Sequence, residues 1–287
     1  MSEYNPIGEN LDQLPPLLYK YKSFDKDGYG ISMATKGELF FPSPGKFNDP
    51  FETYFLPKSK MIELPEDELK EYIHKKTKQR FAKETRKKRI ELESIAFDRA
   101  QKFKEDPSLA AEEMLEHQYE QFGILSLVKE PTSLPMWAYY SNNHSGMCIG
   151  LKTEALAKFQ KFMIQEHGEL LLLHDVIYTE EIPEVNIDTP LDDSETEVKE
   201  SELVHYTKSD HWQHEDEIRL IFWKHPNTTC ELGPGAIGEV MVGIKADDDD
   251  VNELISKLKS NNSNATVKRA KKSSYEYGVD FEVIEEL

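Results

Sequence analysis

The stretch HWQHEDEIRLIF at residues 211–222 places two carboxylates and a guanidinium at alternating positions. In an extended strand Glu215, Glu217 and Arg219 would share one face, because successive side chains point to opposite sides. If that face opens into a cleft, Arg219 can hold one glutamate while the other acts as a base or binds a ribose hydroxyl. If the face meets bulk water, the same residues form only a solvated sheet edge.

A second stretch, MWAYYSNNHSGMCIGL at 136–151, gathers aromatic residues beside a His-Ser-Gly turn. Aromatic planes suit a nucleobase or a nicotinamide ring. We therefore predict an aromatic platform with a polar tip, formed by Trp137, Tyr139, Tyr140 and His144. The alternative is a helix that packs its aromatic side chains on a sheet, with His144 in a solvent-exposed turn.

The hexapeptide FNDPFE at residues 47–52 combines a turn with two aromatics and a carboxylate. Asn48 and Asp49 can hydrogen-bond to nearby backbone amides, and the two phenylalanines would anchor the loop in a core. Glu52 directly follows the second phenylalanine, where water is expected to be scarce. We predict that Asn48 and Glu52 face a ligand across from Glu217; the alternative is a purely structural loop.

The sequence contains no standard motif of several other enzyme classes or of a zinc site. No GxSxG, phosphate-loop or GxGxxG motif is present, which disfavours a serine hydrolase, a phosphate-loop NTPase and a Rossmann enzyme. His205, His211 and His214 lie close in sequence, but their spacing matches no standard zinc motif, so no metal is predicted. Two cysteines form no disulfide framework, which fits a reducing compartment.

Charge limits the partners. The 35 Lys and Arg residues against 54 Asp and Glu give a net charge of −19, which disfavours nucleic acid as a partner. The basic run 74–89 is either a solvated helix face or a contact for nucleic acid or for the chain's own acidic loop. No apolar run reaches the length of a membrane span, and the first residues do not resemble a signal peptide. We therefore predict a cytoplasmic protein with no membrane association.

Hydrophobic patterning predicts the elements that position these residues. Strands are expected at 14–24, 37–44, 122–128, 147–152, 170–179, 216–223, 236–244, 265–273 and 281–287. Helices are expected at 107–121, 154–166 and 247–261, in a short segment carrying Trp137, and within 203–215. Residues 65–105, without Gly or Pro after Pro65, predict one long helix or a helical hairpin.

The sum of these elements predicts an α+β fold. A central mixed or antiparallel sheet would receive strands from both ends of the chain and carry flanking helices. We predict a loose arm at 1–16, a single domain over 17–287, a charged helical insertion at about 60–120 and a flexible acidic loop at 181–202.

Four stretches in this order, LYKYKSF, ELFFPSPGKFNDPFE, MWAYYSNNHSGMCIGL and HWQHEDEIRLIF, resemble the bacterial domain-of-unknown-function 2971 family. The resemblance runs from about residue 17 to the C-terminus, and the helical stretch 60–120 matches none of its motifs. It implies a shared fold more than a reaction.

The order of the parts also looks like the layout of ADP-ribosyltransferases, which bind NAD in a cleft and use a glutamate on a late strand. That likeness implies Glu217 as the catalytic residue and Glu215 as its partner. It further implies a nicotinamide pocket lined by Tyr139, Tyr140 and Ser141. On the first strand, it implies a contact with the ligand through Tyr19, Lys20 and Tyr21. Lys20 stands where those enzymes place an arginine or histidine.

Three functions follow as alternatives. The first is an NAD-using transferase or glycohydrolase, in a defence or toxin-like role, whose Glu217 stabilises an oxocarbenium-like transition state. The second is a non-catalytic module that binds a nucleotide or peptide and docks a protein partner through the helices at 65–105. An accessory protein that uses the basic run 74–89 on nucleic acid is a third.

Overall fold

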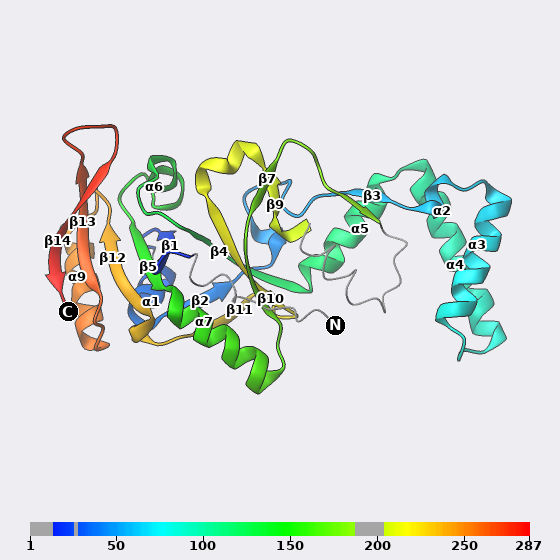
Figure 1. Ribbon diagram of the computed structural model, residues 1–287, viewed down its shortest axis with the longest axis horizontal. Helices are drawn as coiled ribbons and strands as arrows, with labels where there is room; N and C mark the ends of the chain where they lie inside the picture. The colour runs from blue at the N-terminus through cyan, green and yellow to red at the C-terminus, as the bar shows by residue number, and fades with distance from the viewer. Residues whose placement is uncertain (1–13, 26–27, 187–203) are drawn as a thin grey trace. The chain divides into compact units, whose positions relative to one another are not determined.

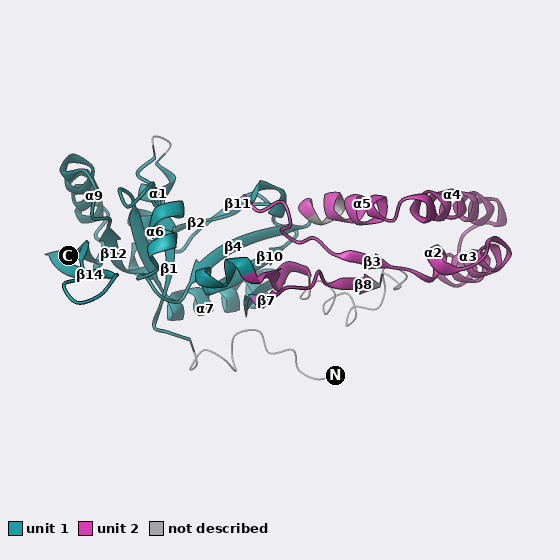
Figure 2. Cartoon of the chain, turned by 90° about the horizontal axis from the view of Figure 1, so that it is seen from above, with its two compact units in different colours: residues 1–47, 121–176, 211–287 teal, residues 48–120, 177–210 magenta. Residues whose placement is uncertain are grey.

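The computed structural model describes residues 14–25, 28–186 and 204–287. These form two compact units, which Figure 2 shows in different colours. We call residues 1–47, 121–176 and 211–287 the sheet unit, and residues 48–120 and 177–210 the helical unit. The single domain expected over residues 17–287 stays a prediction.

An eight-stranded mixed sheet dominates the sheet unit (Figure 1). Its spatial order is β14 (Val279–Glu286), β13 (Thr266–Lys272), β12 (Ile237–Val242), β5 (Met147–Lys152), β1 (Leu17–Lys22), β4 (Phe122–Val128), β10 (Glu217–Trp223) and β6 (Leu171–Asp175). Neighbours pair antiparallel except β12 and β13, which are parallel. Strands from both ends of the chain meet in this sheet, so the predicted α+β class is confirmed.

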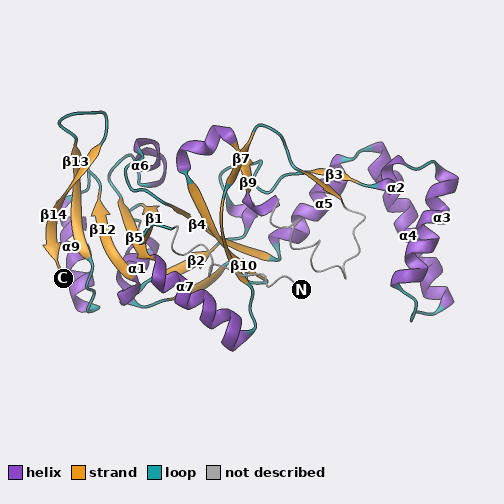
Figure 3. Cartoon of the chain, in the orientation of Figure 1, coloured by secondary structure: helices purple, strands orange, loops and turns teal. Residues whose placement is uncertain are grey.

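Helices cover both faces of this sheet. One face forms the larger apolar core with α1 (Tyr29–Lys36), α7 (Thr153–Phe162) and α9 (Asp248–Ser260). The other face carries α6 (Leu134–Tyr140), whose Met136 and Trp137 pack into a second, smaller core. Figure 3 distinguishes these helices from the strands by colour. A short antiparallel pair of β2 (Glu38–Phe41) and β11 (Thr228–Glu231) completes the unit.

Strand β1 illustrates how the sequence assigns the two faces. Leu18 belongs to the larger core, whereas Tyr19 and Tyr21 pack into the smaller one with α6. This alternation follows from the geometry of an extended strand. It places Lys20 on the face opposite to its two tyrosine neighbours.

The helical unit contains the predicted charged insertion. Its helices are α2 (Lys60–Glu63), α3 (Glu66–Arg80), α4 (Arg86–Glu105) and α5 (Ser108–Tyr119). The segment expected as one helix or a hairpin is a hairpin, because the chain turns after Arg80 and Thr85 caps the next helix by accepting from the Lys88 amide at 3.2 Å. Leu69, Ile73 and Ala100 form its buried core.

Two short parallel pairs also belong to the helical unit: β3 (Leu56–Lys58) with β8 (Glu184–Asn186), and β7 (Ile177–Thr179) with β9 (Thr207–Ser209). They correct three expectations. Residues 170–179 form two strands rather than one, the segment 203–215 contains a strand, and the acidic loop begins with one. Pairings of three residues depend on tertiary contacts, which local patterning does not encode.

Some expectations fall outside the described residues, namely most of the arm 1–16 and the acidic segment 187–203. Helix α1 was not expected. None of the helices in the described ranges combines the length and apolar character that a membrane span requires.

Candidate functional site

Glu217 and Arg219 lie on one face of β10 and form a buried ion pair. Arg219 Nε donates to Glu217 Oε1 at 2.9 Å, and Nη2 donates to Oε2 at 3.2 Å. Their exposed fractions are 3% and 0%, and the guanidinium lies 5.8 Å from the centre of the Phe47 ring. The predicted pairing of a glutamate with Arg219 is present, and the solvated-edge alternative is wrong.

Glu215 does not share this strand face, which corrects the sequence analysis. It ends a 3₁₀ helix (Asp210–Glu215), and Asp216 then adopts a left-handed φ of 43° before β10 begins. That turn breaks the alternation on which the expectation depended. The buried Glu215 carboxylate instead accepts a hydrogen bond from the Tyr140 hydroxyl at 2.7 Å, so α6 and the 3₁₀ helix are joined by a polar contact.

Tyr19 lies on the same sheet face as Glu217, because both residues pair with Val128. Its hydroxyl donates to Glu239 at 3.0 Å, and Glu239 in turn forms an ion pair with Lys268. Burial, and then the charge of Glu239, raise the pKa of the Tyr19 hydroxyl. The Tyr19 hydroxyl is therefore hydrogen-bonded within the sheet, and the role expected of Tyr19 at the first strand stays a prediction.

Trp137 and Ser141 are both fully buried, so neither lines an open pocket. The Trp137 ring meets Tyr21 edge to face, with centroids 5.2 Å apart, and its Nε1 donates to the Pro131 carbonyl at 2.8 Å. The Ser141 hydroxyl donates to the Trp137 carbonyl at 2.6 Å. The expected platform of α6 is thus mostly core, as its alternative held.

Tyr139 is the exception on α6, with 68% of its surface exposed. Its ring lies 6.4 Å from that of His214, in the 3₁₀ helix that also provides Glu215. The predicted neighbours Tyr139 and Tyr140 therefore face different surroundings. One meets solvent, and the other is bound to a buried carboxylate.

His144 is the residue of this motif that reaches a cavity. It lies in a tight turn, with a φ of 70°, and its ring stacks on Trp137 at 6.4 Å with an interplanar angle of 8°. The His144 amide donates to the Trp137 carbonyl at 3.0 Å, and its carbonyl accepts from the Lys245 amide at 2.9 Å. Burial, and then the charge of Lys245, lower the pKa of the ring, so it is neutral near pH 7.

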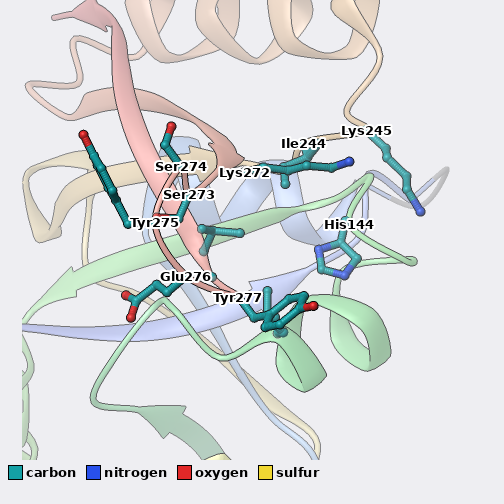
Figure 4. Close-up of a pocket in the computed structure, with 12 residues that line it drawn as sticks. His144, Ile244, Lys245, Lys272, Ser273, Ser274, Tyr275, Glu276 and Tyr277 are labelled. Carbon is teal, nitrogen blue, oxygen red and sulfur yellow. The ribbon is translucent and has the colours of Figure 1, made fainter.

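A pocket of about 790 Å³ opens beside this turn, and the hairpin between β13 and β14 forms its other wall. Figure 4 shows the side chains that line it, among them His144, Ile244, Lys245, Lys272, Tyr275 and Tyr277. Both tyrosines are essentially fully exposed. In this view Tyr277 lies on the same side of the hairpin as His144, whereas Tyr275 and Glu276 lie on the other.

Lys245, Lys272 and Tyr277 were not among the expected site residues. They belong to no recognisable motif, although the hairpin sequence SSYEYG carried a signal: two tyrosines in a polar turn have no core to enter. Their assembly with His144 depends on the parallel pairing of β12 and β13, which brings residues 245 and 272 near each other at the same sheet end.

Lys20 lies elsewhere. Its ammonium donates to the Ser126 carbonyl at 2.7 Å and lines a different pocket, on the face opposite to Glu217. The likeness to ADP-ribosyltransferases had grouped Lys20 with Tyr19 and Tyr21. The alternation of β1 separates them.

Asn48 and Glu52 belong to the helical unit, so their distance from Glu217 stays a matter of prediction. Within that unit Asp49 Oδ1 accepts from the Phe51 amide at 2.9 Å, as expected for this turn. Phe51, however, is 65% exposed and does not anchor the loop, and Asn48 is also exposed. Glu52 is 4% exposed, and its charge raises the pKa of Tyr119 after the larger effect of burial.

Metal ligands do not gather in the described ranges: no group of three or more His, Cys, Asp or Glu side chains there could hold an ion. His211 and His214 are linked only by a contact of 3.2 Å from His214 Nδ1 to the His211 carbonyl. Cys148 is completely buried, and burial raises the pKa of its thiol, so it is a poor nucleophile.

Comparison with known proteins adds one finding. No curated protein sequence and no solved structure matches this chain. The likeness to ADP-ribosyltransferases therefore stays a prediction. The segment from α6 through most of β10, residues 136–220, matches the family model described as "Protein of unknown function (DUF2971)", which supports the resemblance to that family over this part of the chain.

Proposed function

We propose that this chain is a binding protein for a small anion that carries a planar ring, with a nucleotide as the representative ligand. The ligand would occupy the pocket between the His144 turn and the β13–β14 hairpin, which we call the hairpin pocket. The observation that carries the proposal is the combination of ring side chains with the two lysines Lys245 and Lys272 in one cavity of ligand size.

The His144 ring is held ready for stacking. Trp137 supports one side of it, and main-chain hydrogen bonds on both sides of the turn fix its backbone. A ring that is already in place loses little conformational entropy when a ligand binds. Because the ring is neutral near pH 7, its surroundings favour contact with an aromatic plane over an ion pair.

The exposed Tyr277 of the hairpin provides the opposite surface. Tyr277 places an aromatic ring in water at the edge of the pocket. A bound base would cover apolar area of this ring, and stacking on an aromatic side chain is typically worth about 1–3 kcal/mol per base. The exposed ring of Tyr277 therefore favours a ligand that contains a planar ring.

Two ammonium groups support the preference for an anion. On a chain of net charge −19, a phosphate binds only where local positive charge overrides the total. Lys245 and Lys272 both line the hairpin pocket, against the single carboxylate of Glu276. Neither lysine makes an ion pair with another of the described residues, so both ammonium groups can serve a ligand.

An NAD-using transferase is the competing function, and the pair on β10 gives it less support. Both oxygens of Glu217 accept hydrogen bonds from Arg219, and the carboxylate is 3% exposed. A catalytic carboxylate must reach the reacting ribose. We therefore propose that Glu217 stabilises the fold, and NAD enters our account as one possible occupant of the hairpin pocket.

Isothermal titration calorimetry with a divided set of ligands tests the proposal. ATP and NAD carry both ring and charge, adenosine carries the ring alone and tripolyphosphate carries the charge alone. We expect ATP or NAD to bind more tightly than either fragment. Equal affinity for tripolyphosphate and ATP would contradict the stacking surface, and absence of binding to all four would contradict the function. Release of nicotinamide from NAD would favour the transferase instead.

Matched variants locate the binding. Tyr277→Ala should weaken ATP binding about tenfold or more, since a stacking contact is lost, whereas Tyr139→Ala removes an exposed tyrosine of α6 outside the pocket and should have no effect. Lys272→Ala should weaken binding, whereas Lys271→Ala, which breaks a pair with Glu282 at 3.6 Å, should not. Equal effects of variant and control would place the ligand elsewhere.

A protein partner is a further part of the proposal and concerns the helical unit alone. A groove of about 530 Å³ runs between α3, α4 and α5, and Ile95 on its edge is 55% exposed. Apolar side chains exposed beside a groove are typical of docking surfaces. Loss of a captured partner on Ile95→Asp, with unchanged helicity, would support this role.

A further inference from the structure

A second cavity in the sheet unit is independent of the hairpin pocket. It has a volume of about 310 Å³ and lies against the face of β1 that carries Lys20 and Lys22. Lys46 also lines the cavity. Lys36 forms an ion pair with the lining residue Glu38, with 3.4 Å between Lys36 Nζ and Glu38 Oε1. We call this cavity the β1 pocket.

The β1 pocket contains more positive than negative groups. Lys20, Lys22 and Lys46 line it, against Asp25 and Glu38. Two of these groups are already engaged, because Lys20 donates to the Ser126 carbonyl and Glu38 pairs with Lys36. The three lysines and two carboxylates leave one net positive charge, and Lys22 and Lys46 are the lining lysines closest to being available to a ligand.

Lys22 is the most unusual of these groups. Burial lowers the pKa of its ammonium, and the charge of Asp25 only partly offsets this effect. Its ammonium makes no hydrogen bond or ion pair with any residue of the described ranges. A half-buried cation in this situation is stabilised when an anion binds beside it.

Asp25 defines a second requirement. Its Oδ1 atom is buried and has no hydrogen-bond partner within the described part of the chain. A buried acceptor without a donor costs free energy, which a hydroxyl of a ligand would recover. The ligand that satisfies both observations carries an anionic group and a hydroxyl.

We propose that the β1 pocket is a second ligand site, which binds a small phosphorylated sugar or polyol with its phosphate at Lys22 and Lys46 and a hydroxyl at Asp25. The Phe40 ring forms one wall, with the Lys46 ammonium 5.6 Å from its centre, so the phosphate is drawn to the side of the cavity where that ammonium lies. The volume lies at the small end of the range for ligand pockets and suits such a molecule better than a dinucleotide.

Calorimetric titration of the full chain with ribose 5-phosphate, inorganic phosphate and ribose tests this site. We expect ribose 5-phosphate to bind most tightly, phosphate more weakly and ribose weakest. Lys22→Ala should weaken both phosphates about 10- to 100-fold, because a charge-assisted contact is lost. Asp25→Ala should weaken ribose 5-phosphate but not phosphate, so that the advantage of the sugar disappears.

Controls separate this site from its alternatives. Lys161→Ala removes an exposed lysine of α7 outside the pocket and should change nothing. Lys272→Ala should leave ribose 5-phosphate binding unchanged, which distinguishes the β1 pocket from the hairpin pocket. If Lys22→Ala does not fold, Lys46→Ala and Asp25→Ala decide instead. Absence of binding, equal affinities for phosphate and ribose 5-phosphate, or binding unaffected by the pocket variants would overturn the proposal.

Discussion

Glu217 and Arg219 form a bidentate pair with almost no exposure to water. A single substitution leaves one charge buried without its partner, which typically costs about 3–5 kcal/mol. We therefore expect Arg219→Met to lower the free energy of unfolding by about that amount, whereas the double variant Glu217→Leu/Arg219→Met should recover the part that comes from the unpaired Glu217 charge. Urea denaturation of the three proteins measures this.

The surface pair Glu253–Lys257 of α9, at 2.6 Å, provides the control for this prediction. Exposed pairs contribute at most about 1 kcal/mol, so Lys257→Met should have little effect. If Arg219→Met and Lys257→Met lower the free energy of unfolding by similar amounts, water reaches the ion pair on β10. Glu217 would then regain its standing as a catalytic candidate.

The pKa of the His144 ring depends on the surroundings of its turn. Its pKa lies below the ordinary 6.5, because of burial and Lys245. The unfolded chain therefore binds the proton more readily, so this residue's contribution to stability is complete above about pH 6.5 and is lost as the pH falls below that value. Bound phosphate beside Lys245 should move the pKa of the ring upward. An NMR titration of the His144 ring, with and without ATP, measures both shifts, and a value above 6.5 in the free protein would contradict the account.

At the scale of elements, the end of β12 determines where the His144 turn lies. A Cβ added to Gly243 would approach the His144 carbonyl oxygen to 2.1 Å, and backbone cannot yield as a side chain does. Gly243→Ala should therefore lower the free energy of unfolding by about 1–3 kcal/mol and weaken ATP binding. Gly235→Ala is the control, because its Cβ would meet nothing within 4 Å. Equal stability of the two variants would contradict this packing.

The same scale shows what the sequence could predict. Long periodic or apolar runs, such as β4 at Phe122–Val128 and α9 at Asp248–Ser260, were found where expected, because pattern and structure are both local there. The strand pairings of three residues and the left-handed Asp216 were missed, since tertiary contacts impose them. Within the motif around Trp137, the turn residue His144 lines the hairpin pocket, whereas Trp137 itself is buried.

At the scale of the molecule, buried apolar clusters lie within each unit. In the helical unit, fully buried Leu69 of α3 packs with Ile73 and Ala100. Leu69→Ala should lower the stability of this unit by about 2–5 kcal/mol, because it removes a large side chain from that core. Hydrogen exchange of the α3 and α4 amides measures the change. Ile90→Ala, at a position that is 55% exposed, should leave the exchange unchanged, and equal effects would contradict the assigned core.

The net negative charge of the whole molecule opposes the binding of an anionic nucleotide. A net charge of −19 repels a nucleotide everywhere except near local clusters of lysines, and the hairpin pocket contains two. We propose that these two lysines overcome that repulsion. Titration of ATP into the wild type and into Lys245→Ala/Lys272→Ala, after circular dichroism has shown that both proteins are folded, measures their contribution.

We expect the wild type to bind ATP and the double variant to bind it about 100-fold more weakly or not at all, because two charge-assisted contacts are lost. Equal binding of ATP by the two proteins, or no binding by the wild type, would contradict this proposal.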